Sequence, residues 1–168
     1  IDARMLGPKQ TGIGRYVQHL IDGLKKKRGK EFVLFLRQDQ FDKIDEQNIS
    51  KIKASSRWYS WGEQTSFLRK LKREACDLVH FPHFSHPIFY SNPFVITIHD
   101  LTPLYYPGKN TPVHRKLAYR LVLRSACKRA EKIITPSFHT KKDILEHFSL
   151  PGDKVEVIYE GVRFAPRL

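Results

Sequence analysis

The sequence predicts an α/β fold: a Rossmann-like open parallel sheet with helices on both faces. Short apolar runs of strand length alternate with longer stretches in which apolar residues follow helical spacing. Strands that alternate with helices pair in parallel, and both faces of such a sheet are covered. Glycines, histidines and a serine each follow a strand-like run and precede a helix-like one. In a parallel sheet these positions share the carboxyl edge, where open α/β folds bind ligands.

Apolar spacing and turn residues set the expected elements of the first half. The helix that starts at Gly12 has apolar residues at helical intervals as far as Leu24, and Phe32 opens an uninterrupted apolar run. In chain order we expect the end of a strand at 1–6, a loop at 7–11, a helix at 12–24, strands at 32–36 and 49–53, and a helix at 61–74.

Prolines and a capping serine mark the elements of the second half. Prolines break residues 99–113 into a loop, and Ser137 stands where a helix N-cap belongs. We expect strands at 77–81 and 94–98, a helix at 113–130, a strand at 132–135, a helix at 138–148 ended by Pro151-Gly152, and a strand at 155–159. The side chains of helix 113–130 expected to face the sheet are Leu117, Ala118, Leu121 and Val122.

Length and composition indicate one globular domain. The chain has 168 residues, 40% of them hydrophobic, and no apolar run approaches the ~20 residues that cross a membrane. Cys76 and Cys127 stand among apolar neighbours and are expected to be buried thiols, which favours a reducing cytoplasm. The chain begins at Ile1 without an initiator methionine, so we expect a fragment of a longer protein.

The net charge of +13 favours anionic partners. The cations gather in three clusters near expected helices, where they complement helix dipoles and form solvated faces. The clusters are Lys25, Lys26, Lys27, Arg28 and Lys30; Arg69, Lys70, Lys72 and Arg73; and Arg115, Lys116, Arg120, Arg124, Lys128 and Arg129. Together they are also suited to contact with an anionic lipid surface.

The segment Thr11 to Tyr16 places Gly12, Gly14 and Arg15 at the start of a helix. Glycine allows close approach of a ligand to the backbone, and a helix N-terminus offers free N–H groups to a phosphate. The segment is not a dinucleotide fingerprint, because Val17 stands at the third glycine position. An anion-accepting loop and a simple turn both remain open.

Three histidines in HFPHFSH, His80, His83 and His86, resemble metal ligands. Zinc sites usually include thiolates or carboxylates, and Pro82 and Pro87 interrupt this histidine segment, so we predict no metal site. We expect His80 to be partly buried, and His83 with Phe84 to line a groove that suits a sugar ring.

His99 and Asp100 follow the apolar run Phe94–Ile98 directly. An imidazole there can hydrogen-bond a substrate hydroxyl, and the carboxylate can orient the ring or a nearby loop. A purely structural role for the pair is the alternative. The sequence contains no P-loop and no nucleophile-elbow motif.

The ordered set IDARML, TGIGRY, DLVHFPHF, VITIHDLTPLYYP, AEKIITPSFHTKKDI and DKVEVIYEGV resembles the N-terminal domain of glycosyltransferase family 4. The resemblance extends from Ile1 to about Val162. It implies half of a GT-B enzyme, in which two Rossmann-like domains face each other across a cleft. It also implies retaining transfer of a hexose, such as mannose, from a nucleotide sugar, without bound metal or cofactor.

The resemblance assigns roles to individual residues. Gly12 and Gly14 would approach donor phosphates or the acceptor, His99 would reach the transferred sugar, and Ser137 would belong to the cleft rim. Glu160 stands where asparagine is more usual. The predicted catalytic residues are His99 and Asp100. The predicted substrate-binding residues are Gly12, Gly14, Arg15, His80, His83, Phe84 and Ser137.

The domain organisation implied is an acceptor-side domain at 1–162 and the start of an interdomain linker at 163–168. A donor-binding domain would lie outside this chain, which would then be inactive alone. The expected partners are a nucleotide-sugar donor, mainly through the other domain, and a glycan or lipid-linked acceptor, at a cytoplasmic site with peripheral membrane contact and no nucleic acid. The competing hypothesis is a non-catalytic basic module that binds nucleic acid or an anionic membrane.

Overall fold

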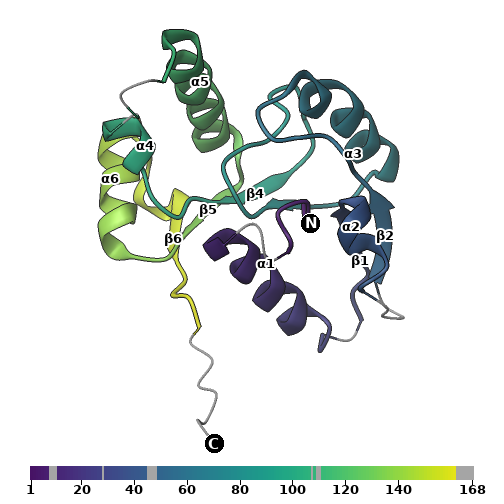
Figure 1. Cartoon of the computed structure of the whole chain (residues 1–168). Coiled ribbons are helices and arrows are strands. Elements are labelled where there is room, and N and C mark those ends of the chain that lie inside the picture. Colours follow the sequence, from purple (N-terminus) through teal and green to yellow (C-terminus); the bar gives the residue numbers. More distant parts are fainter. Residues whose placement is uncertain (8–10, 28, 45–48, 107, 109–110, 162–168) are drawn as a thin grey trace, which may run out of the picture.

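The computed structural model describes residues 1–7, 11–27, 29–44, 49–106, 108 and 111–161 (Figure 1). Helices separate most of the parallel strands, as predicted, but the connection at 82–93 between two of the strands contains no helix. The first half contains α1 (Thr11–Leu24), β1 (Phe32–Leu36), α2 (Gln38–Phe41), β2 (Ile49–Lys53) and a π-helical segment (Glu63–Phe67) that continues into α3 (Leu68–Glu74). The second half contains β3 (Val79–Phe81), β4 (Phe94–Thr97), α4 (Thr102–Tyr105), α5 (Val113–Arg129), β5 (Lys132–Thr135), α6 (Phe138–Phe148), a short 3₁₀ turn (Gly152–Lys154) and β6 (Val155–Val157).

The N-terminal segment joins two groups of parallel strands. β1 pairs with β2, and the other group has the order β3-β4-β5-β6. The Asp2 N–H donates to the His80 carbonyl of β3 at 2.9 Å, and the Phe35 N–H of β1 donates to the Ile1 carbonyl at 3.0 Å. Residues 1–2 therefore act as a short strand between β1 and β3.

This pairing defines a point where the direction of strand addition reverses. The chain first adds β1 and β2 on one side of residues 1–2. It then crosses to the other side of residues 1–2 and adds β3, β4, β5 and β6 there. The loops that leave residues 1–2 and β3 diverge there at the carboxyl edge. Such switch points are where open α/β sheets bind ligands.

Alternating strand residues bury two opposite faces of the sheet. Leu34 and Leu36 of β1 join Val17 and Ile21 of α1 in one apolar cluster, while Phe35 between them joins the other. Figure 1 shows α1 on one side of the sheet, with α3 and α5 on the opposite side. The prediction of helices on both faces is confirmed.

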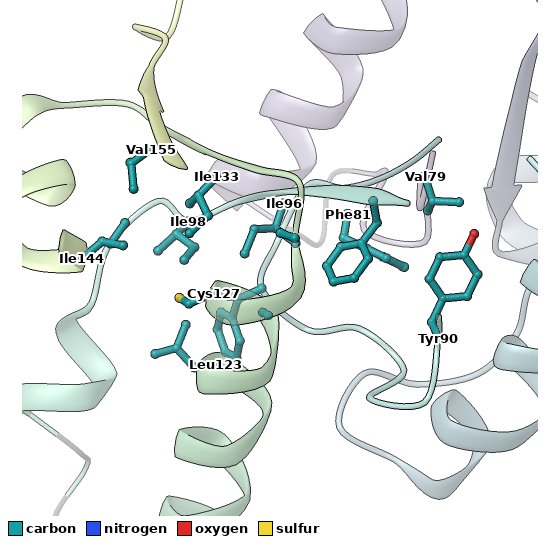
Figure 2. Packing of buried hydrophobic residues seen from close by; sticks show 14 of the residues in the cluster. Val79, Phe81, Tyr90, Ile96, Ile98, Leu123, Cys127, Ile133, Ile144 and Val155 are labelled. Atoms are coloured by element: carbon teal, nitrogen blue, oxygen red, sulfur yellow. The ribbon is translucent and has the colours of Figure 1, made fainter. Parts of the chain in front are cut away.

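The larger cluster packs α3, α5 and α6 against β3 to β6. Figure 2 shows Ile96 and Ile98 directed toward Leu123 and Cys127 of α5, all of them almost completely buried. Burial raises the pKa of the Cys127 thiol to about 12. Cys127 is thus the buried thiol predicted from sequence, whereas Cys76 is only half-buried.

The predicted sheet-facing side of α5 is wrong. Leu117, Leu121 and Ala118 are exposed and Val122 is half-buried. The buried residues of α5 are Leu123, Ala126 and Cys127. Apolar residues lie on both faces of this helix, so periodicity alone selected the wrong one.

Other departures from the sequence prediction are local. The loop expected at 99–113 contains the short helix α4, and strands β3, β4 and β6 are shorter than expected. α6 ends at Phe148, before Pro151 is reached, and its C-cap residue Ser149 adopts the left-handed conformation. Among the described residues, no helix is both long enough and apolar enough to span a membrane.

Candidate active site

Three side chains from three elements form a hydrogen-bonded chain at the switch point. The Thr97 hydroxyl lies 3.0 Å from the Tyr16 hydroxyl of α1 and 2.9 Å from Nε2 of His80. Thr97 and His80 end up adjacent because β3 and β4 pair in register, with His80 opposite Val95. The Thr97 hydroxyl has a single proton. It can therefore donate in only one of these two hydrogen bonds, and it accepts in the other.

His99 stands beside this chain at the end of β4. Its ring meets that of Tyr16 edge-on, with centroids 5.0 Å apart. Nε2 lies 3.0 Å from the Pro82 carbonyl, which can only accept, so Nε2 carries a proton. Nδ1 lies 3.3 Å from Oε1 of Glu160. Pro82 and Tyr16 therefore orient the ring, and its Nδ1 edge faces Glu160.

Burial keeps this part of the site uncharged. Desolvation is the main cause that lowers the pKa of His80 to about 3, so its imidazole is neutral at physiological pH. Desolvation also raises the pKa of Tyr16, and the negative charge of Glu160 adds to that effect. Around Thr97 the site consequently presents neutral donors and acceptors, and the carboxylate of Glu160 stands at its more exposed side, with 55% of its side chain accessible.

The glycine loop predicted to bind phosphate begins α1. Gly12 is exposed, and a Cβ added there would meet no atom within 4 Å, so packing among the described residues does not require a glycine. Gly14 is buried within the first turn of α1, and Arg15 is exposed beside Tyr16. Gly12, Gly14 and Arg15 therefore lie on α1, the helix that also positions Tyr16 in the site.

The three histidines of HFPHFSH take three different positions. His83 lies in the loop that follows β3. Its Nδ1 accepts a hydrogen bond from the Ser85 N–H at 3.3 Å and lies 3.4 Å from the Tyr59 hydroxyl. His86 is fully buried and stacks on Phe94. No group of three potential metal ligands converges within the part of the chain that the structure describes.

Phe84 is placed differently from the sequence prediction. Only 5% of the residue is exposed, and its ring packs edge-on against Tyr119 of α5 and in a tilted contact with His83. The expectation that Phe84 lines an open groove is therefore not met, because its ring belongs to the core. Through its tilted contact, the Phe84 ring helps to fix the position of the His83 ring.

Asp100 and Ser137 each make a local backbone contact. Asp100 accepts from the Thr102 N–H at 2.8 Å and so fixes the start of α4, while its neighbour His99 takes Glu160 as its carboxylate partner. Ser137 caps α6 by accepting from the Thr140 N–H at 3.1 Å. Both follow strands at the carboxyl edge, but neither contacts the Tyr16–Thr97–His80 chain in the contacts described.

A buried ion cluster supports the loops around the site. Arg4, fully buried, donates to Asp2 at 2.7 and 2.8 Å and to Glu63 at 2.7 Å, and its guanidinium lies 3.7 Å from the centre of the Phe67 ring. Glu63 also accepts from the Ser85 hydroxyl at 2.9 Å. The cluster ties the loop after residues 1–2 to the loop after β3.

Sequence reasoning missed Tyr16 and Thr97 as site residues. In the sequence Tyr16 fits the apolar spacing of its helix, so nothing local distinguishes it from a core residue, although its hydroxyl contacts Thr97 at the carboxyl edge. Thr97 offered a signal, because it is a polar residue within an otherwise apolar strand. Glu160 drew attention only as a departure from the family pattern, and its contact with His99 emerges from the fold.

Comparison with known proteins identifies the family of this chain. Residues 10–165 match the model of Glycosyltransferase Family 4. The chain is also 23% identical over 175 aligned positions to an O-antigen chain mannosyltransferase, RfbU, of Salmonella typhimurium. That alignment covers 96% of this chain and 48% of the relative, so the chain spans about half of the relative's length. The chain has a Rossmann-like fold and belongs to glycosyltransferase family 4.

Proposed function

We propose that this chain is the acceptor-side half of a retaining, metal-independent glycosyltransferase that uses a nucleotide-sugar donor. The observation that carries the proposal is the group formed by Tyr16, His80, Thr97 and His99 at the switch point of a family 4 domain. Hydroxyl and imidazole groups suit the hydroxyls of a sugar. The similarity to a mannosyltransferase supports a hexose, with mannose as the first candidate.

His99 is the proposed contact to the transferred sugar. Its Nε2 is held by the Pro82 carbonyl and its Nδ1 lies 3.3 Å from Oε1 of Glu160, so a sugar hydroxyl would take the place of the Glu160 carboxylate at Nδ1. Glu160 is more than half exposed, and a sugar hydroxyl can therefore reach this edge. A hydrogen bond there strengthens as positive charge develops at the anomeric carbon, and such a contact lowers the barrier more than it improves binding.

We further propose that a second, donor-binding domain completes the cleft, with residues 163–168 as the start of the linker. The linker and Val162 lie outside the described residues. Catalysis needs groups on both sides of a cleft held in register, so the 168-residue chain alone is expected to be inactive. The proposed setting is the cytoplasmic face of a membrane, where a lipid-linked or glycan acceptor is within reach.

The test is steady-state kinetics of the protein that contains this chain at its full natural length. We expect transfer from a nucleotide sugar, unaffected by a chelator, with the anomeric configuration of the donor retained in the product. His99→Ala should lower kcat about a hundredfold while KM for the donor changes little. The His99 side chain is 17% exposed and contacts Tyr16 and the Pro82 carbonyl, so a thermal melt of the variant must accompany the kinetics to separate a loss of stability from a loss of chemistry.

Four results would contradict the proposal. An inverted product would reject the retaining mechanism, and loss of activity with the chelator would reject metal independence. Near-normal turnover of His99→Ala, or a loss explained by melting, would make His99 structural. Turnover by the 168-residue chain alone would show that the donor site lies within it.

A further inference from the structure

Tyr59 has an unusual backbone conformation for a bulky residue. Its φ is 57°, in the left-handed region that residues other than glycine seldom adopt. The Tyr59 N–H donates to Oε2 of Glu63 at 3.0 Å, and Glu63 is itself held by the buried Arg4. Such strain persists only where the surrounding contacts enforce it, and it is concentrated at functional sites. The buried ion cluster therefore fixes Tyr59 on the connection that follows β2 at the carboxyl edge.

The side chain of Tyr59 is anchored at its hydroxyl and open elsewhere. The hydroxyl lies 3.4 Å from Nδ1 of His83, and the ring is tilted against that of Phe84 with centroids 5.8 Å apart. Burial around the hydroxyl raises the pKa of Tyr59, and the nearby Tyr119 adds to that effect. The residue as a whole is nevertheless 58% exposed. A firmly held aromatic ring is therefore accessible to a ligand.

His83 supplies a hydrogen-bond donor beside this ring. Its Nδ1 accepts from the Ser85 N–H, and burial lowers its pKa to about 4, so the neutral ring carries its proton on Nε2. Nε2 makes no hydrogen bond within the described part of the chain, although His83 is partly exposed. A neutral N–H group whose direction is fixed in this way suits a ligand oxygen.

Tyr59 and His83 adjoin the proposed position of the transferred sugar. The centroids of their rings are 6.1 Å apart. His83 directly follows Pro82, whose carbonyl lies 3.0 Å from Nε2 of His99. A molecule bound by Tyr59 and His83 is thus next to a sugar bound at His99, where the second substrate of a transfer reaction has to lie.

We propose that Tyr59 and His83 form a subsite for a neutral sugar residue of the acceptor, which stacks on Tyr59 and accepts a hydrogen bond from Nε2 of His83. The inference rests on the proposed function, because it assigns the second substrate of that reaction. The C–H groups on one face of a sugar suit an aromatic ring, and its hydroxyls suit a neutral donor.

The surroundings of the two residues favour a carbohydrate over the phosphate of a lipid carrier. Phosphate recognition ordinarily uses arginine or lysine. No such cation contacts Tyr59 or His83 in the part of the chain that the structure describes, where their partners are Glu63, Phe84 and Ser85. A phosphate placed here would lack a positive partner, whereas a sugar needs none.

The test measures binding of the methyl α-glycosides of mannose, galactose and glucose by saturation-transfer NMR, without donor. It uses the protein that contains this chain at its full natural length. We expect at least one glycoside to bind. Tyr59→Asn should weaken binding at least about tenfold, because it removes the ring while asparagine tolerates the left-handed backbone. Tyr59→Phe, which keeps the ring, should bind within about threefold of the unsubstituted protein.

His83 is tested by two substitutions. His83→Ala should weaken glycoside binding about fivefold, which corresponds to the loss of one neutral hydrogen bond. His83→Gln keeps a neutral N–H donor and should recover part of that loss. Thermal midpoints of all variants check that each one folds, and the Tyr59 variants test the subsite independently if His83→Ala melts early.

Phe89→Ala is the matched control. Phe89 is also an exposed aromatic residue, at 68%. Arg129, at the end of α5, holds the carbonyl of the neighbouring Ile88 and so places Phe89 toward the amino edge of the sheet, opposite the site. Its substitution should leave glycoside binding unchanged.

Failure of all three glycosides to bind, or binding that Tyr59→Asn does not weaken, would overturn the proposal. Displacement of the glycoside by geranyl phosphate, with a dependence on Tyr59, would do the same, because the subsite would then hold a lipid phosphate. Failure of the proposed function gives a different result. A protein that binds glycosides through Tyr59 but transfers no sugar from a nucleotide sugar would support the subsite and reject the reaction.

Discussion

At the residue scale, Thr97 occupies the centre of the candidate site. Its hydroxyl is the only group that contacts both Tyr16 and His80 in the hydrogen bonds described, and the residue is almost completely buried. A threonine in a core strand ordinarily adds little to stability. Here its hydroxyl satisfies two other buried or half-buried polar groups, so its contribution exceeds that of one hydrogen bond.

We predict that Thr97→Val destabilises the chain by about 1–3 kcal/mol, because valine has the same shape but leaves His80 and Tyr16 without a partner. Thr135→Val on the neighbouring strand is the matched control. Thr135 is equally buried, and its hydroxyl has no hydrogen-bond partner among the described residues. That variant should be neutral or stabilising in urea denaturation. Equal effects of the two substitutions would show that the Thr97 contacts carry no stability.

Arg4 offers a second prediction at this scale. Its guanidinium is fully buried between Asp2 and Glu63, so Arg4→Leu strands two buried carboxylates. We expect a loss of about 3–5 kcal/mol in the free energy of unfolding. Arg37→Leu, which removes an exposed partner of Asp39, should cost less than about 1 kcal/mol. Chemical denaturation of both variants measures the difference, and a small effect at Arg4 would mean that water reaches the cluster.

At the scale of the element, α5 shows how one helix serves two environments. Its later turns cover β4 and β5 through Leu123, Ala126 and Cys127, whereas its first half extends beyond the sheet. A helix that packs along its whole length shows a single apolar stripe. The two apolar faces of α5 follow from its length relative to the sheet that it covers.

This division predicts different costs for two leucines close together in the sequence. Leu123→Ala should destabilise the chain by about 2–5 kcal/mol, because it leaves a cavity under β4. Leu121→Ala should change stability by no more than about 0.5 kcal/mol, since Leu121 is 57% exposed. Thermal or urea denaturation distinguishes them. Similar losses would mean that Leu121 is covered in solution by part of the folded chain.

At the scale of the whole molecule, neutral histidines make the fold sensitive to acid. Burial lowers the pKa of His80 to about 3 and those of His83 and His86 to about 4, against about 6.5 in an unfolded chain. As the pH falls below 6.5 the unfolded chain gains protons that the folded chain does not bind. Stability is therefore fully present above pH 6.5 and decreases below it.

We predict that the free energy of unfolding falls between pH 6.5 and 5 by up to about 1.4 kcal/mol per pH unit for each of the three histidines. His86→Gln should reduce this slope by about one third, while costing some stability at neutral pH because the ring stacks on Phe94. Urea denaturation at several pH values measures the slope. An unchanged slope in His86→Gln would show that His86 is protonated in the folded chain.

The sequence by itself determined the order of elements and the edge of the sheet where the site lies. Apolar runs such as Phe32–Leu36 and the N-cap at Ser137 are local signals, and they located strands and helices to within a few residues. Because parallel strands end on the same edge, a position in the last residues of a strand (His80) or just after one (His99) was enough to bring these two residues into one region. The ordered motifs also identified the family.

Only the tertiary structure decided which side chains meet. The partners of Thr97 are 17 and 81 residues away, and Glu160 is 61 residues from His99, so no local pattern connects them. The buried face of α5 depends on where the helix crosses the sheet, and Arg4 is buried because Glu63 arrives from a distant segment. Local propensity and periodicity act over a few residues, whereas these contacts arise from strand order and register, which are properties of the assembled sheet.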